Sequence, residues 1–296
     1  MTIAVSGANG FTGRFVCKEL QRRQLPFVAL LRPGSDTSWM DAHQIPVCFA
    51  DLNNAQQLAA QLKGCDALLN VASIGFGAAP SILEACRSAA VRRAVFVSTT
   101  AIFTQLNAAS KVVRQAAEAA ITSSGLDTTI IRPTMIYGTP GDRNMIRLVR
   151  WLERWPVLPV FGNGRSLQQP VHVSDVAWAV VQVLEKNPAT IKRQFNISGA
   201  APLTYNDVVR LTAPALGRRV KRFHIPARPI VMALQVSERL GITLPIKAEQ
   251  VLRLNEDKAF SHADAADAFG YSPIAFEQGI RQEVALLRSS GDGLNI

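Results

Sequence analysis

The chain begins with a short apolar strand that runs directly into three glycines and then into a helix. The strand covers Ile3–Ser6, and Gly7, Gly10 and Gly13 follow at intervals of three residues. In such a loop the first glycine permits a tight turn, the second lets the backbone approach a pyrophosphate, and the third lets the helix pack closely on the strand. Because the free N–H groups of a helix N-terminus attract phosphates, this pattern predicts a dinucleotide-binding site rather than an ordinary glycine turn.

The bulk properties narrow the class of protein to expect. A chain of 296 residues can form one large domain, or one domain with a smaller lobe. It starts directly with a strand and has no apolar stretch long enough to cross a membrane, so we expect neither a secretory signal nor a membrane span. The four cysteines are scattered, which suggests buried reduced thiols in a cytoplasmic protein. No metal site is expected.

The net charge of the chain is compatible with several kinds of binding partner. The formal net charge is +10, which suits nucleic acid, an anionic membrane surface or a phosphorylated ligand, or simply a basic solvated surface. The chain has no dense run of Lys and Arg and no nucleic-acid-binding motif, so we expect no nucleic-acid partner. A place at the inner membrane surface remains an alternative to a free cytoplasmic one.

Strand and helix patterns alternate over the first 135 residues or so. Short apolar strands alternating with helices predict a parallel sheet with helices on both faces. The expected strands are residues 3–6, 27–32, 47–50, 67–71, 94–98 and 128–132, and the expected helices are residues 15–23, 55–62, 79–90 and 110–123. After Pro133 prolines interrupt shorter elements, which predicts a different kind of structure in the rest of the chain.

Several motifs along the chain match one superfamily. The glycine loop reads Gly-x-x-Gly-x-x-Gly with Ala8, Asn9 and Thr12 between the glycines, and further landmarks lie at residues 132–138, 169–177, 195–199 and 269–273. The chain thereby resembles the extended and atypical branches of the short-chain dehydrogenase/reductase superfamily, of the nucleoside-diphosphate-sugar epimerase and dehydratase type. The resemblance implies a Rossmann-type doubly wound parallel sheet over residues 1–135. It also implies a smaller C-terminal substrate lobe over residues 136–296, with residues 165–200 partly returning to the sheet.

The end of the second strand indicates which cofactor the site prefers. An acidic residue there favours NAD, whereas a basic residue accommodates the 2′-phosphate of NADP. The chain has Arg32 at this position, and Arg14 follows the third glycine, so we expect NADP(H) to bind more tightly than NAD(H). An ordinary surface arginine is the alternative for Arg32. The resemblance assigns Asp51 and Leu52 to the adenine. It adds further cofactor contacts at Asn9, Phe11, Thr12, Ala72 and Pro133.

The tyrosine that the superfamily uses for proton transfer is missing. Its members carry a Tyr-x-x-x-Lys pair on the helix after the fifth strand, together with a Ser or Thr. The chain has only Tyr137, Tyr205 and Tyr271, and none lies on the helix expected at residues 110–123. The Ser or Thr position survives as Thr99 or Thr100. The usual acid–base mechanism is therefore in doubt.

Two alignments of the altered pair remain open. One places Asn107 and Lys111 at the tyrosine and lysine positions, and the other places Ser110 and Arg114 there. The second fits the spacing to residues 132–133 better. Ser110 is a far weaker proton donor than tyrosine, while Arg114 stays protonated and is expected to hold the nicotinamide ribose. On this basis, Thr99, Thr100, Ser110 and Arg114 are expected at the reaction centre.

A basic aromatic segment, residues 143–155, follows the first substrate-lobe landmark. Arg143, Arg147, Arg150 and Arg154 recur every three or four residues and therefore share one helical face. This face could clamp a pyrophosphate, rest on an anionic membrane, or simply face solvent while the helix packs on the main domain. Residues 227–240 form a second amphipathic stretch. His172 lies in another landmark and is a candidate substrate contact, although a lone histidine is more often structural.

The leading hypothesis from the sequence is an NAD(P)-dependent oxidoreductase or epimerase-like enzyme. Its expected substrate is a nucleotide- or pyrophosphate-linked sugar, with Arg143, Arg147 and His172 as substrate contacts. The rival hypothesis is a non-catalytic NADP(H)-binding regulator or assembly factor. The substrate-lobe landmarks favour the enzyme, whereas the missing tyrosine favours the rival. Nothing in the sequence indicates an oligomeric state.

Overall fold

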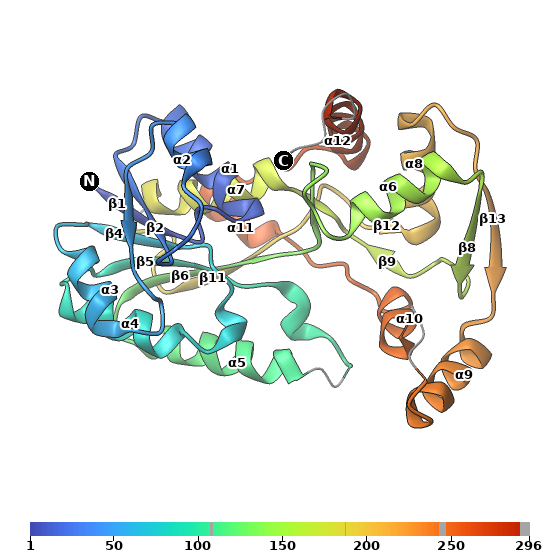
Figure 1. The fold of residues 1–296 in the computed structure, drawn as a ribbon, viewed down its shortest axis with the longest axis horizontal. Helices are drawn as coiled ribbons and strands as arrows, with labels where there is room; N and C mark the ends of the chain where they lie inside the picture. The colour runs from blue at the N-terminus through green and yellow to red at the C-terminus, as the bar shows by residue number, and fades with distance from the viewer. Residues whose placement is uncertain (107–108, 187, 243–246, 291–296) are drawn as a thin grey trace.

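The protein is built around a parallel sheet with helices on both faces (Figure 1). The computed structural model describes residues 1–106, 109–186, 188–242 and 247–290. Within them the main sheet has seven strands in the order β11-β6-β5-β4-β1-β2-β3, all parallel to their neighbours. The strands are β1 (Ile3–Ser6), β2 (Phe27–Leu31), β3 (Val47–Phe49), β4 (Ala67–Asn70), β5 (Arg93–Val97), β6 (Asp127–Pro133) and β11 (Arg193–Ile197).

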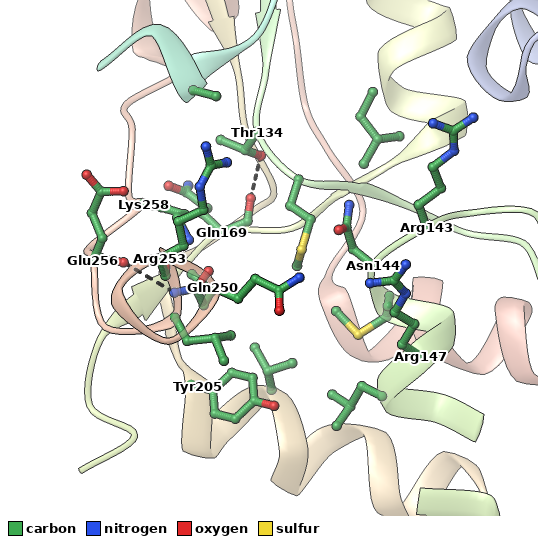
Figure 2. Close-up of a pocket in the computed structure, with 18 of the residues that line it drawn as sticks. Thr134, Arg143, Asn144, Arg147, Gln169, Tyr205, Gln250, Arg253, Glu256 and Lys258 are labelled. Carbon is green, nitrogen blue, oxygen red and sulfur yellow. Dashed lines mark hydrogen bonds between the residues drawn. The ribbon is translucent and has the colours of Figure 1, made fainter. Parts of the chain in front are cut away.

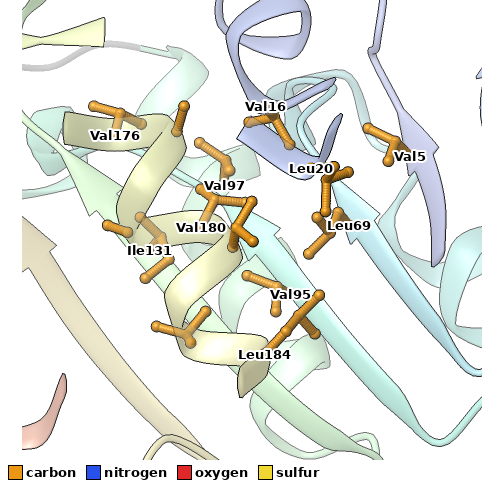
Figure 3. Close-up of a cluster of buried hydrophobic side chains, with 14 of the residues drawn as sticks. Val5, Val16, Leu20, Leu69, Val95, Val97, Ile131, Val176, Val180 and Leu184 are labelled. Atoms are coloured by element: carbon orange, nitrogen blue, oxygen red, sulfur yellow. The ribbon is translucent and has the colours of Figure 1, made fainter. Parts of the chain in front are cut away.

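Helices cover both faces of this sheet, and its central strands β1, β4 and β5 are accordingly buried throughout and mostly apolar. One face carries α1 (Phe11–Arg22), α2 (Ser38–Ala42), α7 (Val173–Glu185) and α11 (Ala263–Phe269). The other face carries α3 (Ala55–Leu62), α4 (Ala79–Ser88) and α5 (Ala109–Thr122). Figure 3 shows how Val176, Val180 and Leu184 of α7 pack against strand residues such as Val95 and Ile131. The expected Rossmann-type doubly wound sheet is confirmed.

The expected strands and helices of the first 135 residues are all present, with shifted ends. The β5 strand begins at Arg93, one residue earlier than expected. This arginine is buried within the fold although it is charged. Its guanidinium donates hydrogen bonds to the carbonyl oxygens of Asp127 and Val183. The sequence pattern did not predict the short helix α2 or a strand at residues 193–197. These residues, within the range 165–200 that was expected to return partly to the sheet, form its strand β11.

The C-terminal lobe packs around a separate apolar core beside the sheet. Its helices are α6 (Met145–Arg154), α8 (Tyr205–Ala215), α9 (Ala227–Arg239), α10 (Ala248–Leu254) and α12 (Phe276–Ser290). Its short strands pair as β7 (Ile136–Tyr137) with β10 (Val171–His172), β9 (Leu167–Gln168) with β12 (Leu203–Thr204), and β8 (Val157–Phe161) with β13 (Lys221–Ile225). Two 3-10 helices, η1 (Ile74–Phe76) and η2 (Thr100–Phe103), follow β4 and β5 in the main domain.

The chain passes between the two lobes more than once. After β10 it returns to the sheet through α7, which packs on α1, and then through β11, which pairs with β6. It leaves for α8, α9 and α10 and comes back again at α11. No helix among the described residues has the length and apolarity needed to cross a bilayer.

Candidate cofactor and substrate site

The glycine loop between β1 and α1 is packed so tightly that two of its glycines are required by the fold itself. Gly7 has a φ of +70°, and a Cβ there would lie 2.5 Å from the backbone N of Ala72. A Cβ on Gly13 would lie 2.0 Å from the carbonyl oxygen of Gly7. These glycines therefore fix the turn and bring α1 close to β1, as the sequence pattern predicts.

Gly10 is different, because the surrounding protein leaves room for a side chain. It is exposed, its φ is −75°, and a Cβ there would meet only the Gly7 carbonyl oxygen, at 3.2 Å. No side chain caps the N-terminus of α1, and its first turn, which starts with Phe11 and Thr12, has no acidic residue. The free N–H groups and the open approach at Gly10 fit the pyrophosphate of a dinucleotide.

Beside the glycine loop, Arg14 is held by contacts to neighbouring side chains. Its guanidinium donates to Asn9 Oδ1 at 2.8 Å and lies 5.2 Å from the centre of the Trp39 ring. Asn9 in turn donates to the carbonyl oxygen of Asp36 at 2.8 Å. Arg14 is thus fixed between the glycine loop and the β2–α2 loop, where the adenosine end of a dinucleotide would lie.

The β2–α2 loop carries charges of both signs. Arg32 is exposed directly after β2, as expected. Asp36, which the sequence analysis did not single out, is also exposed. Its carboxylate accepts hydrogen bonds from the backbone N and hydroxyl of Ser38, both at 2.9 Å. These hydrogen bonds, with a smaller contribution from Arg14, lower the pKa of Asp36. The spacing of Asp and Ser at the start of a short helix is a local signal that could have revealed it.

The expected adenine contacts lie at the end of β3. Asp51 is exposed, and its carboxylate accepts a hydrogen bond from the backbone N of Asn53 at 2.9 Å. Leu52 is half-buried and packs against the core on the α3–α4 side of the sheet.

The loop after β4 brings Ala72 beside Gly7 and Gly75 beside Arg114 of α5. Ala72 lies against Gly7, and a Cβ on Gly75 would lie 3.0 Å from Arg114 Nε. Lys111 instead turns away and donates to the carbonyl oxygen of Thr104 at 2.6 Å. Two cations, Lys111 and Arg114, were candidates for the lysine position. Of these, Arg114 is the one whose side chain contacts the loop that is expected to pass below the nicotinamide ribose. Ser110 is half-buried one turn earlier on α5, while Asn107 lies outside the described residues.

A cavity of about 1000 Å³ lies between the carboxyl ends of β5 and β6 and the C-terminal lobe. Thr99, Thr100 and Pro133 line it on the sheet side, together with Phe11 from the glycine loop. The Thr100 hydroxyl donates to the Pro133 carbonyl oxygen at 3.3 Å, whereas Thr99 Oγ1 accepts from the backbone N of Ala101 at 3.2 Å. Ser110 and Arg114 are not among the described lining residues of this cavity.

Charged side chains lie on two sides of the cavity (Figure 2). Arg143 and Arg147 come from the start of α6 on one side, as the sequence analysis expected, and Arg253 and Lys258 come from α10 and the segment after it on the other. Arg150 and Arg154, further along α6, are exposed but do not line the cavity.

The segment after α10 joins the C-terminal lobe to the main domain. The Glu256 carboxylate accepts hydrogen bonds from the Thr104 hydroxyl at 2.8 Å and the Gln105 backbone N at 2.7 Å. The Phe103 and Phe260 rings also meet, with 5.5 Å between their centres. These contacts close one wall of the cavity. They could not be read from the sequence, because the partners lie far apart along the chain.

Two buried carboxyl groups meet behind the start of α6. Asp142 Oδ1 accepts hydrogen bonds from the backbone N of Asn144 and Ile146, while Asp142 Oδ2 and Glu283 Oε1 are both buried and have no other polar partner. Burial, followed by the interaction with Asp142, raises the pKa of Glu283 to about 9. A proton on Glu283, donated to Asp142, satisfies both oxygens.

We therefore expect the Glu283→Gln variant to be more stable than the wild type at alkaline pH. Glu283 keeps its proton in the folded protein up to about pH 9, whereas an unfolded chain releases it near the ordinary value of 4.5. Over that window the folded state binds the extra proton, so the free energy of unfolding falls as pH rises. Glutamine stays neutral and can still donate to Asp142. Chemical unfolding over this pH window measures the difference between the two proteins.

Glu277→Gln is the matched control, because Glu277 lies on the same helix and is exposed in an ion pair with Arg281. Its stability should follow the wild-type pH dependence. Equal pH slopes for the wild type and Glu283→Gln would contradict the shared proton.

His172 has a structural position. It is buried, it forms the N-cap of α7, and its Nδ1 lies 2.7 Å from the Ser174 hydroxyl. Burial lowers the pKa of His172 to about 4, so the ring is neutral at physiological pH. It is not among the described residues that line the cavity, so the geometry gives no support to its expected contact with substrate.

The three tyrosines lie away from α5, as the sequence analysis noted. The hydroxyls of Tyr137 and Tyr271 are buried and donate to backbone carbonyl oxygens of Phe276 and Ser198. Only Tyr205, at the start of α8, is among the described lining residues of the cavity. Burial raises its pKa, which makes it a poor replacement for the missing acid. In the described part of the chain, no group of three His, Cys, Asp or Glu side chains could hold a metal ion.

A parallel Rossmann-type sheet whose first strand leads into this glycine loop defines a dinucleotide-binding protein. The family described as NAD(P)H-binding matches residues 7–187, which is more than half of the chain. The chain therefore belongs to the NAD(P)H-binding family. The resemblance to nucleotide-sugar epimerases and dehydratases is confirmed for the fold, because several solved structures with these names have the same fold.

The chain is similar in sequence to curated reductases and shares its fold with several solved structures. The chain is 28% identical over 246 residues to the ceramide reductase of Caulobacter vibrioides, covering 78% of this chain and 75% of that protein. It is 24% identical over 327 residues to the 2-alkyl-3-oxoalkanoate reductase of Stenotrophomonas maltophilia, covering 95% and 98%. Among solved structures, a nucleoside-diphosphate-sugar epimerase of Pseudomonas aeruginosa has a TM-score of 0.81 at 16% identity, covering 98% of each chain. The UDP-glucose 4-epimerase of Thermotoga maritima, determined with UDP-glucose, has a TM-score of 0.76 at 16% identity, covering 98% and 99%.

Proposed function

We propose that the protein is an NADP(H)-dependent oxidoreductase for a carbonyl or secondary-alcohol group on a largely apolar, anionic molecule. The cavity carries this proposal, because it starts at the carboxyl ends of β5 and β6, where open α/β sheets bind their ligands. Bound NADP(H) would supply or accept the hydride there. The glycine loop would hold its pyrophosphate, and Arg14 and Arg32 its 2′-phosphate.

The composition of the cavity wall indicates the class of substrate. Apolar side chains cover much of it: Phe103, Met135, Met145, Leu148, Trp151, Leu158, Val160, Phe161, Val208, Val251, Leu254 and Phe260. Arg143, Arg147, Arg253 and Lys258 add positive charge for a carboxylate or a phosphate. The two curated relatives are named for the reduction of a ceramide and of a 2-alkyl-3-oxoalkanoate. The second name combines an oxo group, an alkyl group and a carboxylate, which agrees with such a wall.

Three residues of the chain would have separate roles in the reaction: Thr99 would orient the substrate, Arg114 would hold the cofactor ribose, and Lys258 would donate a proton. The Thr99 hydroxyl accepts from Ala101 N, so its proton remains to orient a substrate oxygen. Arg114 lies on the loop below the expected ribose and would hold it. Lys258 lines the cavity, its ammonium donates to the Arg253 carbonyl oxygen, and burial lowers its pKa, so Lys258 would be a better proton donor than Ser110 or Tyr205.

A nucleotide- or pyrophosphate-linked sugar is the second candidate substrate. Arg143 and Arg147 line the same side of the cavity, where they could contact a diphosphate. The similar structure from Thermotoga maritima was determined with UDP-glucose. The expectation from the sequence therefore remains a candidate, although the apolar walls favour the first one.

A substrate panel tests these proposals with the full chain. NADPH oxidation is followed with alkyl-substituted 3-oxo acids, with nucleotide-linked sugars and with lipid-pyrophosphate-linked sugars. Turnover of the 3-oxo acids would support the first proposal, and turnover of the linked sugars alone would replace it with the second. Tight NADP(H) binding without any turnover, together with a stable protein partner, would favour the non-catalytic regulator or assembly factor.

The arginines of α6 offer a matched pair of variants for the substrate that turns over. We expect Arg147→Ala to raise KM by about tenfold with a smaller effect on kcat, because a charge-assisted contact to the distant anionic group contributes about 1.5 kcal/mol to binding in ground and transition states alike. Arg150→Ala removes the same charge from the same helix, outside the cavity. Steady-state kinetics should therefore show no change in KM for Arg150→Ala. Equal effects of the two substitutions would place the anionic group elsewhere.

A further inference from the structure

The helix α9 presents an apolar stripe that no other described element covers. Met232, Val236 and Leu240 are spaced four residues apart along α9, and their exposed fractions are 66%, 53% and 69%. Leu234, on the opposite side of the helix, is the only residue of α9 that is buried. It packs against Ala248 and Val251 of α10. We call Met232, Val236 and Leu240 the α9 stripe.

The charges around the α9 stripe are almost all positive. At 100° per residue, Arg228 and Arg239 fall next to Met232 at one edge of the stripe. The acidic Glu238 falls toward α10 instead, where its carboxylate accepts a hydrogen bond from Ala248 N at 3.0 Å. From residue 216 to residue 242 the chain has a single acidic residue, Glu238, against six cations: Arg218, Arg219, Lys221, Arg222, Arg228 and Arg239.

We propose that α9 docks the protein on an anionic lipid bilayer, with Met232, Val236 and Leu240 among the lipid chains and Arg228 and Arg239 at the headgroups. An exposed apolar stripe bordered by cations is the pattern of a helix that lies in the plane of a membrane surface. A symmetric dimer through the same stripe would place these arginines near their own copies, which disfavours it. Nucleic acid would leave the apolar stripe without a partner.

The docking surface also lies next to the cavity described above. The hairpin of α9 and α10 protrudes from the C-terminal lobe at the end remote from the glycine loop (Figure 1). Val251 of α10 contacts α9 and also lines the cavity, and Leu254 lines the cavity while 38% exposed. Docking through the stripe would thus bring one wall of the cavity to the bilayer. The docking itself does not rest on the proposed activity.

Vesicle binding by the full chain tests the proposal without substrate or cofactor. The protein is sedimented with vesicles of phosphatidylcholine alone and with vesicles that also contain phosphatidylglycerol. We expect binding to the second kind only, weakened about fivefold by each of Arg228→Ala and Arg239→Ala. The Met232→Glu/Leu240→Glu variant should lose at least about tenfold in affinity for each replaced side chain. All these residues are exposed, so the melting temperature should stay unchanged.

Val112→Glu is the matched control, because Val112 is 64% exposed on α5, in the other lobe. It adds one negative charge, as each of the two stripe substitutions does, to an exposed apolar site and should bind vesicles as the wild type does. Lack of wild-type binding to anionic vesicles, or equal loss in the control and the stripe variant, would overturn the proposal. So would a solution dimer that the stripe variant dissociates, because the stripe would then be a subunit interface.

Discussion

Replacing Gly10 by valine is expected to lower the affinity for NADP(H) by a hundredfold or more and to leave the fold of the free protein intact. A Cβ at Gly10 meets only one backbone oxygen, at 3.2 Å, and the residue already has a φ that any amino acid adopts. A valine side chain would instead occupy the approach to the free N–H groups at the start of α1. Each charge-assisted hydrogen bond lost there costs about 1.5–3 kcal/mol, so two account for roughly a hundredfold or more.

Gly13→Val provides the contrast within the same loop. Its Cβ would lie 2.0 Å from the Gly7 carbonyl oxygen, inside the protein's own packing. We expect this variant to lose stability even without cofactor, whereas Gly10→Val should melt near the wild-type temperature. Calorimetric titration with NADPH and thermal melting of both variants separate the two effects. Normal NADPH binding by a folded Gly10→Val protein would mean that the pyrophosphate lies elsewhere.

The strands of the main sheet and the glycine loop could be predicted because their signals are local. Buried parallel strands require short apolar runs, and the turn from β1 into α1 requires glycine at Gly7, for its positive φ, and at Gly13, for the close approach of α1 to this turn. Even here the strand β5 was predicted one residue too far along the chain. In a sequence, a charged residue such as Arg93 is evidence against a buried strand. Only the structure shows the carbonyl oxygens on β6 and α7 that accept its hydrogen bonds.

The parts that escaped prediction depend on contacts between distant segments. Asp142, just before α6, meets Glu283 of α12, and Glu256 accepts hydrogen bonds from Thr104 and Gln105 in the other lobe. Neither member of these pairs has a local pattern that names its partner. The cavity wall at Lys258 is likewise formed only when the segment after α10 meets the main domain.

The sequence left open whether Lys111 or Arg114 replaces the usual lysine, and the structure favours Arg114. Lys111 and Arg114 lie less than one helical turn apart, and either alignment was compatible with the motif. The structure brings the Arg114 guanidinium against Gly75 in the loop after β4 and turns Lys111 toward the carbonyl oxygen of Thr104. The proposal that Arg114 holds the nicotinamide ribose rests on this difference. An Arg114→Ala variant that bound cofactor normally would oppose it.

Two substitutions in the β2–α2 loop are expected to change cofactor preference in opposite directions. Arg32→Ala should weaken NADPH binding by roughly tenfold to a hundredfold and leave NADH binding unchanged, because it removes a charge-assisted contact of about 1.5–3 kcal/mol to the 2′-phosphate. Asp36→Asn should strengthen NADPH binding modestly, because the exposed Asp36 carboxylate lies in the same loop and repels a phosphate.

Arg32→Ala and Asp36→Asn are expected to change the affinity for NADPH in opposite directions, so together they test the preference for NADP(H) over NAD(H). Asp36→Asn keeps one oxygen that can accept from the Ser38 backbone N, and its amide nitrogen can donate to the Ser38 hydroxyl oxygen, so the start of α2 should stay in place while the charge is removed. Titration of wild type and both variants with NADPH and NADH gives six affinities. If NADH binds the wild type as tightly as NADPH, or if Arg32→Ala weakens both cofactors equally, Arg32 does not select the 2′-phosphate. Arg14, fixed by Asn9 and Trp39 beside the same loop, would then be the next residue to replace.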